Sequence, residues 1–465
     1  MGAGRRPHVR PRTATVSEAR DRAPLERNSR PPTNNCHFRC PTIPPWLFFE
    51  QRRPSARHHS RSHEYGENGE ETTGGRRSRI DHFVVFRAAG RSKDSTTNRH
   101  GTTRVDHGND VETEGTAMRA VVFDGFGSTP EVRTVADPAV SPDGVVVAVE
   151  ATGLCRSDWH AWQGHEPDVT PPHVAGHELA GRLVEVGSSV RGWHPGDRVT
   201  VPFVCACGTC HQCATGNQQV CEHQFQPGAT HWGSFAERVA VPRAETNLVA
   251  LPDELPTTSA ATLGCRFATS FRAVLRQGAV RAGQWVAVHG CGGAGISTVV
   301  IAAAAGARVV AVDLSDEALR LAAELGAEHT VNGNRHPDTA EAVRELTGGG
   351  AHVSLDCVGH PASCAASISS LRTRGTHVQL GLMPPQRGLP PVPMHEVIAR
   401  ELRVLGTHGL QAHEYPEMLR LVTGSRIDLD RLIGRRIGLD DIPAALTAMN
   451  EATPPSSGIT VAEIG

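Results

Sequence analysis

The chain has 465 residues and nearly balanced charge, with 47 Lys and Arg against 49 Asp and Glu and a formal net charge of -2. A chain of this length is typical of two or three domains. No apolar run approaches the roughly 18–20 residues that cross a bilayer, so we expect no membrane-spanning segment. The N-terminal residues lack the apolar core of a secretory signal, which favours a cytoplasmic location. In that compartment the twelve cysteines favour metal ligation over disulfides.

The first 117 residues differ in composition from the rest of the chain. They carry 21 basic and 14 acidic side chains, whereas the remaining 348 residues carry 26 and 35. Apolar residues rarely recur there at a helix or strand period, so burial cannot offset the entropy of ordering the backbone. We therefore predict a disordered Arg/Pro-rich extension over residues 1–117.

Two other interpretations of this extension stay open. Translation that starts at Met118 would make the segment a gene-model artefact, since MRAVVFDGFG is typical of a first strand. A basic arm that binds nucleic acid is the second interpretation. The interspersed acidic residues and the lack of an aromatic stacking pattern count against it, so we expect no nucleic-acid partner.

The remaining residues contain two patterns that follow one another. The first half holds short apolar runs separated by turn residues, such as MRAVVF, GVVVAVEATG and LAGRLVEVGSSV, which indicate an antiparallel, barrel-like β unit. The second half alternates apolar strands with Ala/Leu-rich helices, as in WVAVHG, ISTVVIAAAAGA, RVVAVD and DEALRLAAELGA. This alternation predicts an α/β domain with a parallel sheet wound with helices.

A glycine-rich run stands between a predicted strand and a predicted helix. The strand WVAVHG leads into GCGGAG, whose glycines are Gly290, Gly292, Gly293 and Gly295. Glycine allows the tight turn and a close backbone approach to a pyrophosphate, and the helix N-terminus attracts the phosphates. Asp313 ends the next strand, where an acid binds the ribose hydroxyls and repels a 2′-phosphate, which favours NAD over NADP. A tight turn without a ligand, with Asp313 as a helix cap, is the alternative.

Four cysteines with short spacings predict a closed metal site. They are Cys207, Cys210, Cys213 and Cys221. Such a run lets one loop wrap a tetrahedral ion, and four thiolates leave no open position, which is typical of a structural zinc. Disulfides are the main alternative, and Cys205 is an extra thiol that competes as a ligand.

Candidate ligands of a second metal lie far apart in the sequence. They occur in GLCRSDWH (153–160), GHE (176–178) and LGCRFAT (263–269). A single cysteine is more often a small buried hydrophobe, and a single histidine is more often a hydrogen-bonded core or surface residue. Their occurrence together, beside a nucleotide domain and a cysteine loop, indicates an open metal site.

The ordered motifs GLCRSDWH, GHE, PGDRV, CxxCxxCx7C, LGC and GxGGxG resemble the zinc-dependent, medium-chain alcohol dehydrogenase family over residues 118–465. The resemblance implies a GroES-like catalytic domain formed by residues 118–268 and 405–465. It also implies a Rossmann domain over 269–404 that binds NAD. Two Zn²⁺ per subunit and a homo-oligomer, either a tetramer or a dimer, follow from the same resemblance.

The resemblance implies roles for the residues around the second metal. Cys155, His177 and Cys265 match the three protein ligands of the catalytic zinc, a ligand set known for alcohol dehydrogenases. Glu178 matches the adjacent acid that approaches the metal when water or substrate leaves. Asp158 matches a carboxylate that orients a ligand.

Further positions match a proton relay and the pockets. Ser157 and His160 match the relay, with His160 at the surface. Thr269 matches a residue that touches the nicotinamide, and Phe203 matches a residue that lines the substrate pocket. The segment THGLQAHEYPEM, after Leu405, follows no motif to which we assign a role, although the family lines its pockets there.

The implied function is an NAD-dependent alcohol dehydrogenase acting on a small-molecule substrate. It oxidises an alcohol to an aldehyde or ketone by hydride transfer to NAD from a zinc-bound alkoxide. Polyols or sugars are an alternative substrate class. A zinc-free quinone or enoyl reductase is disfavoured by the full ligand set. A non-catalytic zinc- and nucleotide-binding redox sensor is disfavoured by the relay residues.

Overall fold

The computed structural model describes residues 117–384, 388–424, 427–450 and 457–465. The predictions made for residues 1–116, including the disordered extension and the basic arm, lie outside the described residues. Among the residues described, no helix combines the length and apolar character that a membrane crossing requires.

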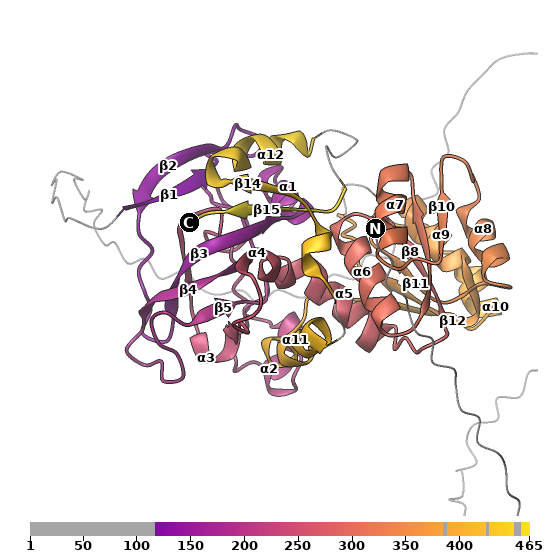
Figure 1. The fold of residues 1–465 in the computed structure, drawn as a ribbon, viewed down its shortest axis with the longest axis horizontal. Coiled ribbons are helices and arrows are strands. Elements are labelled where there is room, and N and C mark those ends of the chain that lie inside the picture. Colours follow the sequence, from indigo (N-terminus) through magenta and orange to yellow (C-terminus); the bar gives the residue numbers. More distant parts are fainter. Residues whose placement is uncertain (1–116, 385–387, 425–426, 451–456) are drawn as a thin grey trace, which may run out of the picture. The chain divides into compact units, whose positions relative to one another are not determined.

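A sheet of seven strands organises the first half of the described chain and its C-terminal end (Figure 1). Its strands are β3 (Val145–Leu154), β4 (Glu178–Val186), β5 (Arg198–Thr200), β6 (Arg238–Val241), β7 (Val249–Ala250), β14 (Ile433–Gly438) and β15 (Ile459–Glu463). All its pairings are antiparallel except the one between β14 and β15. A separate antiparallel hairpin consists of β1 (Ala117–Val122) and β2 (Glu131–Ala136). The predicted antiparallel β unit is confirmed.

The C-terminal strands complete the sheet that the early strands begin. Thr460 of β15 pairs with Leu154 of β3, and Glu463 pairs with Ala151. Figure 1 shows these yellow strands beside the indigo and purple ones. Short helices cover this part of the chain: α1 (Arg156–Trp162), α2 (His211–Ala214), α3 (Ala244–Asn247), α4 (Thr257–Ala260), α11 (Tyr415–Gly424) and α12 (Ile442–Ala448), with the 3₁₀ turns η1 (Gln218–Val220), η5 (Ala412–Glu414), η6 (Leu429–Leu432) and η7 (Leu439–Asp441).

A second sheet of six strands is parallel throughout, in the order β10-β9-β8-β11-β12-β13. Its strands are β8 (Trp285–His289), β9 (Arg308–Asp313), β10 (His329–Asn332), β11 (Ala351–Asp356), β12 (Leu371–Gln379) and β13 (Arg403–Gly406). The helices between them are α6 (Gly293–Ala304), α7 (Asp316–Glu324), α8 (Thr339–Leu346), α9 (Pro361–Ser369) and α10 (Met394–Ala399). The predicted wound parallel sheet is confirmed, and its last strand ends at Gly406, two residues beyond the proposed domain limit at 404.

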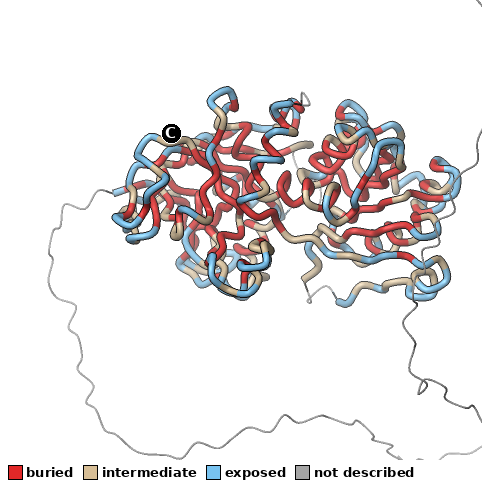
Figure 2. The backbone as a smooth tube through the Cα atoms, turned by 90° about the horizontal axis from the view of Figure 1, so that it is seen from below, coloured by how far each residue is buried: buried red, intermediate tan, exposed pale blue. Residues whose placement is uncertain are grey.

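The strand order reverses at β8, which has β9 on one side and β11 on the other. Ligands of such sheets bind at the carboxyl ends of the strands, where the order reverses. The glycine-rich run follows β8 directly, so it lies at this point. Figure 2 shows the buried residues in red, concentrated in the interior of the described chain. The central strands β3 and β8 are buried along most of their length, which anchors the loops at their ends, whereas the outer strands β13 and β14 are more exposed.

One continuous helical run, preceded by α4, connects the sheets. The chain passes from α4 through η2 (Leu263–Phe267), α5 (Ala268–Arg272) and η3 (Ala273–Gln277). Both η2 and η3 are π-helical, a widened geometry that is frequent at functional sites. Cys265 lies within η2.

Buried histidines with polar partners lie within the parallel sheet. His289 of β8 contacts the Ser370 hydroxyl through Nε2 at 3.4 Å. His377 of β12 contacts Ser367 through Nδ1 at 3.1 Å and Gln379 through Nε2 at 3.3 Å. Burial is the main cause that lowers the pKa of His289, to about 3, and burial also lowers the pKa of His377.

The free energy of unfolding should therefore fall as the pH decreases from 7 to 5. Unfolded histidines take up protons near pH 6.5, whereas buried His289 stays neutral, so the unfolded state binds more protons. One such histidine changes stability by at most about 1.4 kcal/mol per pH unit. Urea unfolding of His289→Gln should show a shallower pH dependence than the wild type, while exposed His336→Gln keeps the wild-type slope. A wild-type slope in His289→Gln would contradict this assignment.

Candidate active site

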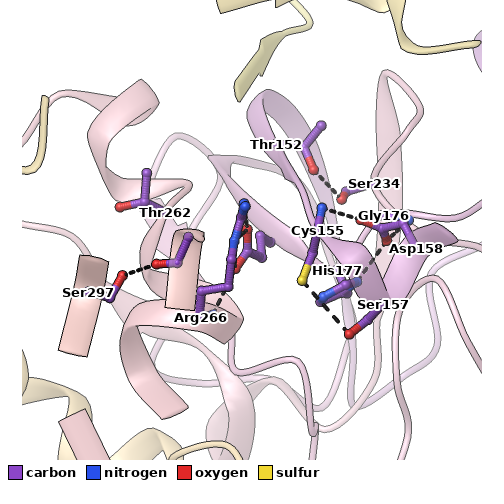
Figure 3. Close-up of polar contacts among 12 residues, drawn as sticks. Thr152, Cys155, Ser157, Asp158, Gly176, His177, Ser234, Thr262, Arg266 and Ser297 are labelled. Atoms are coloured by element: carbon purple, nitrogen blue, oxygen red, sulfur yellow. Dashed lines mark hydrogen bonds and ion pairs between the residues drawn. The ribbon is translucent and has the colours of Figure 1, made fainter. Parts of the chain in front are cut away.

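Three side chains from distant parts of the chain converge in one buried group. Cys155 precedes α1 at the end of β3, His177 precedes β4, and Cys265 lies in the π turn η2. One ligand atom from each lies within 4.8 Å of the others. Figure 3 shows Cys155 and His177 beside Ser157. The structure thus brings together all three residues predicted as ligands of the second metal.

The carboxylate of Asp158 orients this group. It accepts hydrogen bonds from Nδ1 of His177 at 2.8 Å, from the Cys155 amide at 2.7 Å and from the Gly176 amide at 3.1 Å. Burial lowers the pKa of His177, but Asp158 more than offsets this and raises that pKa well above its ordinary value. In the neutral form whose Nδ1 donates to Asp158, Nε2 carries a lone pair. That nitrogen is buried, and no group in the described ranges donates to it. An imidazole held in this way by a carboxylate is the usual arrangement of a metal-ligating histidine.

The electrostatics of the group suit a cation. The contact with Cys265 is the main cause that holds the pKa of the Cys155 thiol well below its ordinary value. Burial opposes this, and His177 and Arg266 reinforce it. Two thiols and one imidazole are a borderline-soft donor set that binds zinc and leaves the fourth tetrahedral position open.

Glu178 lies beside this group but not within it. Its Oε1 accepts hydrogen bonds from the Arg266 amide at 2.8 Å and from Nε at 3.1 Å, and Oε2 accepts from Nε and Nη2. Burial raises the pKa of Glu178, while Arg266 opposes that rise. The ion pair joins the residue after His177 to the residue after Cys265, so it holds two ligand-bearing segments together. Approach of Glu178 to a metal stays a prediction.

Removing one member of this pair should be costly. Arg266→Met leaves the Glu178 carboxylate buried without its partner, which typically lowers the free energy of unfolding by about 3–5 kcal/mol. Arg276→Met, which breaks half-exposed ion pairs with Glu414 and Glu417, should cost less than about 1 kcal/mol. Denaturant unfolding of both variants measures the difference.

The double variant Arg266→Met with Glu178→Gln tests the cause of that loss. With the charge on Glu178 removed as well, it should recover a large part of the stability lost in Arg266→Met. A double variant as unstable as Arg266→Met would show that packing of the Arg266 stem, and not the unpaired carboxylate, is responsible.

The four-cysteine loop forms a second group of ligand atoms. The Sγ atoms of Cys207, Cys210, Cys213 and Cys221 come together within 4.8 Å. Hydrogen bonds from Thr209, first from its amide, lower the pKa of Cys207 to about 5, which favours a thiolate ready for a metal. The cysteines in the described ranges are free thiols, so the disulfide alternative finds no support there.

Cys205 is not part of that loop group. Its Sγ donates to the Pro202 carbonyl at 3.4 Å, and burial raises its pKa to about 12. Cys205 is therefore a neutral buried thiol. The alternative in which Cys205 competes as a ligand of the cysteine loop is wrong.

The glycine-rich run forms the predicted tight turn between a strand and a helix. Gly290 has φ +90°, and its amide donates to the Val312 carbonyl at 2.7 Å. A Cβ on Gly295 would lie 1.8 Å from the Gly290 carbonyl oxygen, so no other residue fits. Gly292 caps α6, and Gly293 is its first residue, which leaves the first amides of the helix at the loop.

Asp313 lies at the end of β9 beside this loop. Its Oδ2 accepts a hydrogen bond from the Cys291 amide at 2.6 Å, and Oδ1 accepts from the Ser315 amide at 2.9 Å. Ser315, and not Asp313, caps α7 by accepting from the Ala318 amide at 3.3 Å. The helix-cap alternative for Asp313 is therefore wrong. Its carboxylate instead holds the glycine turn and the start of the next loop.

The two predicted relay residues lie on α1. The Ser157 hydroxyl is 3.8 Å from the Cys155 sulfur. His160 was expected at the surface, which is wrong, because its exposed fraction is only 5%. The Trp159 ring contacts it edge-on at 4.9 Å, and Nδ1 of His165 lies 2.9 Å from its own Nδ1. Both rings thus pack against the buried His160.

Aromatic side chains stand next to the zinc-ligand group. The ring centroids of Phe203 and His177 are 6.1 Å apart and those of Phe203 and His408 are 5.1 Å apart, both in edge-on contacts. Burial lowers the pKa of His408, so its imidazole is neutral near pH 7. Thr269 is buried in α5. His408 comes from the segment to which the sequence assigned no role.

Three contributors were missed at the level of sequence. Arg266 is a charge inside the apolar stretch TLGCRFATSF, and such a charge needs a buried partner; that signal was available. Tyr415 is fully buried, and its hydroxyl donates to the Gly264 carbonyl at 3.2 Å, which supports the turn before Cys265. His165 follows His160 by five residues, a spacing that is not distinctive in itself.

Comparison with known proteins identifies the family of the chain. Residues 141–253 match the alcohol dehydrogenase GroES-like domain, and residues 293–424 match the zinc-binding dehydrogenase domain. The chain is 36% identical over 293 residues to an alcohol dehydrogenase of Geobacillus stearothermophilus, an alignment that covers 62% of this chain and 84% of that one. It is 31% identical over 332 residues to the L-threonine 3-dehydrogenase of Rhizobium rhizogenes, covering 69% and 93%.

A solved structure gives the same result. A Sinorhizobium meliloti protein described as a zinc-binding dehydrogenase, bound to NADP, superposes with a TM-score of 0.67 at 33% identity. The match covers 75% of this chain and 99% of that one. The fold and these matches define an oxidoreductase with a GroES-like domain and a Rossmann domain. The chain belongs to the zinc-dependent medium-chain dehydrogenase family, which confirms the family predicted from the motifs.

Proposed function

We propose that this protein is an NAD-dependent alcohol dehydrogenase that oxidises an alcohol to an aldehyde or ketone. The observation that carries the proposal is the Cys155, His177 and Cys265 group. Its histidine is oriented by Asp158 and offers a buried, unpartnered Nε2 within the described ranges, as a ligand to a metal with an open position requires.

Zinc held by these three residues would supply a Lewis acid that polarises the substrate oxygen and favours its deprotonation near neutral pH. The other roles belong to side chains of this chain. Ser157 would accept the alcohol proton and direct it toward His160. Phe203 and His408 would line the substrate pocket, and Thr269 would contact the nicotinamide ring. Glu178 pairs with Arg266, which would hold the two ligand segments together, and its approach to the metal stays a prediction.

The glycine-rich run would hold the dinucleotide. The amides at the start of α6 would bind its pyrophosphate. Asp313 would accept hydrogen bonds from the adenosine ribose with lone pairs that the Cys291 and Ser315 amides leave available. Its carboxylate favours NAD because it repels a 2′-phosphate. The NAD-binding domain proposed over residues 269–404 would extend to Gly406, the end of β13, and residues 118–268 with 407–465 would form the catalytic domain.

Asp313→Asn should shift the coenzyme preference toward NADP. Asparagine keeps an oxygen acceptor for only one of the two neighbouring amides, and it removes the charge that repels the phosphate. A relief of about 1.4 kcal/mol corresponds to a tenfold gain in the NADP-to-NAD ratio of kcat/KM. Fluorescence titration with NADH and NADPH measures the same ratio in binding. An unchanged ratio in both measurements would show that Asp313 does not select the coenzyme.

The zinc content of the purified protein tests the two proposed groups of zinc ligands. The wild type should hold two zinc ions per subunit, four-coordinate in the cysteine loop and three-coordinate by protein at Cys155, His177 and Cys265. Cys155→Ala should lose one ion and lose alcohol-dependent NADH formation. Cys213→Ala should lose the other ion and unfold at lower temperature. Active protein with one zinc ion, held by the cysteine loop, would refute the proposal.

The substrate class is tested with a panel of primary, secondary, aromatic and polyol substrates. The Phe203 and His408 rings beside the metal group favour an alcohol with an apolar substituent. A polyol or sugar is the second candidate, and the similarity to an L-threonine 3-dehydrogenase supports a polar substrate. A nicotinamide-linked activity that needs neither zinc nor an alcohol would favour a reductase instead.

The proposal extends to the setting of the enzyme. We propose a cytoplasmic location, since a reducing compartment maintains the free thiols of the described ranges. We also propose a homo-oligomer of two or four subunits. Its support is the edge strand β13 together with exposed apolar side chains at Leu389, Met394 and Ile398. Light scattering on the purified protein measures the subunit number.

A further inference from the structure

The end of helix α1 brings a second histidine onto the relay histidine. Gly164 has φ +75°, a left-handed conformation that favours glycine. Its amide donates to the Ala161 carbonyl at 3.1 Å, and the His165 amide donates to the His160 carbonyl at 2.9 Å. The second bond spans six residues and belongs to a common helix-ending motif, in which the first and last side chains touch. Here that pair of touching side chains is His160 and His165.

The two imidazoles are within hydrogen-bonding distance of each other. Nδ1 of His160 lies 2.9 Å from Nδ1 of His165, and the ring centroids are 5.1 Å apart. One of these nitrogens must donate and the other accept, so the pair shares one proton along this line. His160 is 5% exposed, whereas His165 is only partly buried. The hydrogen bond thus joins an enclosed ring to a ring that meets solvent.

We propose that His165 is the exit of the proton relay, a positioning residue that acts through His160. This inference rests on the proposed alcohol oxidation, in which Ser157 directs a proton toward His160. Because His160 is enclosed, a proton that reaches it needs a second titratable group before it meets water. His165 is the group in contact with it that is also open to solvent.

The transfer balances one proton in and one proton out. A proton arrives on Nε2 of His160, and the N–H bond at Nδ1 of His160 breaks as an N–H bond forms at Nδ1 of His165. The proton on Nε2 of His165 then passes to water. Exchange with water after product release restores the starting tautomers.

The surroundings of the pair are compatible with this role. On α1, Arg156 stacks over the Trp159 ring at 5.1 Å, and that ring contacts both histidines edge-on, at 4.9 and 5.4 Å. In the loop after His165, Glu166 and Asp168 are close enough to interact, and burial raises the pKa of Glu166.

Neutral groups face α1 from the C-terminal segment. The Trp159 indole donates to the Asn450 side chain at 2.7 Å, and Arg156 donates to the Met449 carbonyl at 2.6 Å. The charged group in these contacts with α1 is therefore Arg156, and the acidic groups Glu166 and Asp168 follow His165 along the chain, where Glu166 interacts with Asp168 and with His177.

His165→Asn is the decisive variant. Asparagine retains a hydrogen-bonding partner for Nδ1 of His160 but cannot carry the proton onward. We expect kcat near pH 7 to fall about tenfold, a modest share of what a general base contributes, with KM nearly unchanged. Added imidazole should restore the rate, and the solvent isotope effect on kcat should rise. His194→Asn, which alters an exposed histidine in a turn of the same domain, is the matched control.

A readout without turnover separates this inference from the proposed function. In zinc-loaded protein with labelled histidine, NMR should show His160 and His165 titrating as a coupled pair in two steps. In His165→Asn, His160 should titrate in a single step.

The outcomes decide the two proposals separately. An active wild type, with a His165→Asn variant that keeps the wild-type kcat, pH profile and isotope effect, would overturn the relay exit. A wild type inactive on every alcohol would overturn the proposed function. In that case independent titration of the two histidines would overturn the shared proton as well, and coupled titration would support it.

Discussion

The Asp158 carboxylate, which is only 1% exposed, accepts hydrogen bonds from two separate segments that each carry a ligand. One segment supplies the Cys155 amide, and the other supplies the Gly176 amide and Nδ1 of His177. A buried carboxylate needs such donors, because leaving it unpaired costs several kcal/mol. Satisfying Asp158 therefore brings Cys155 and His177 together and turns Nε2 of His177 toward the metal position.

The third ligand joins through a second buried charge. Arg266 follows Cys265 in the sequence, and Glu178 follows His177. The ion pair between Arg266 and Glu178 therefore lies beside the three ligands, two of which Asp158 holds. The stem of Arg266 also reaches the glycine-rich run, since a Cβ on Gly293 would lie 2.8 Å from the Arg266 Cδ. The Arg266 side chain thus contacts both Glu178, beside the ligand group, and the first residue of α6. A bulky residue at position 293 would therefore displace Arg266 and disturb its ion pair as well as the start of α6.

The sequence predicted the elements and the local motifs well, because those depend on neighbours along the chain. The glycine run needs a turn with φ above zero at Gly290, and the four cysteines lie within one short loop. Even the family follows from ordered motifs. The sequence did not predict the enclosure of His160, because the turn at Gly164 and the packing of Trp159 decide it. It assigned no role to Arg266 or His408, whose contacts lie far along the chain at Glu178 and Phe203.

The amino-acid order by itself determined the two sheet patterns, the candidate ligands and the turn chemistry, since periodicity and spacing act over a few residues. Only the tertiary structure decided which buried groups satisfy one another. It placed the Glu178 carboxylate on Arg266, removed Cys205 from the cysteine group and buried His160. These outcomes depend on desolvation, which is a property of the folded interior and of no single stretch of sequence.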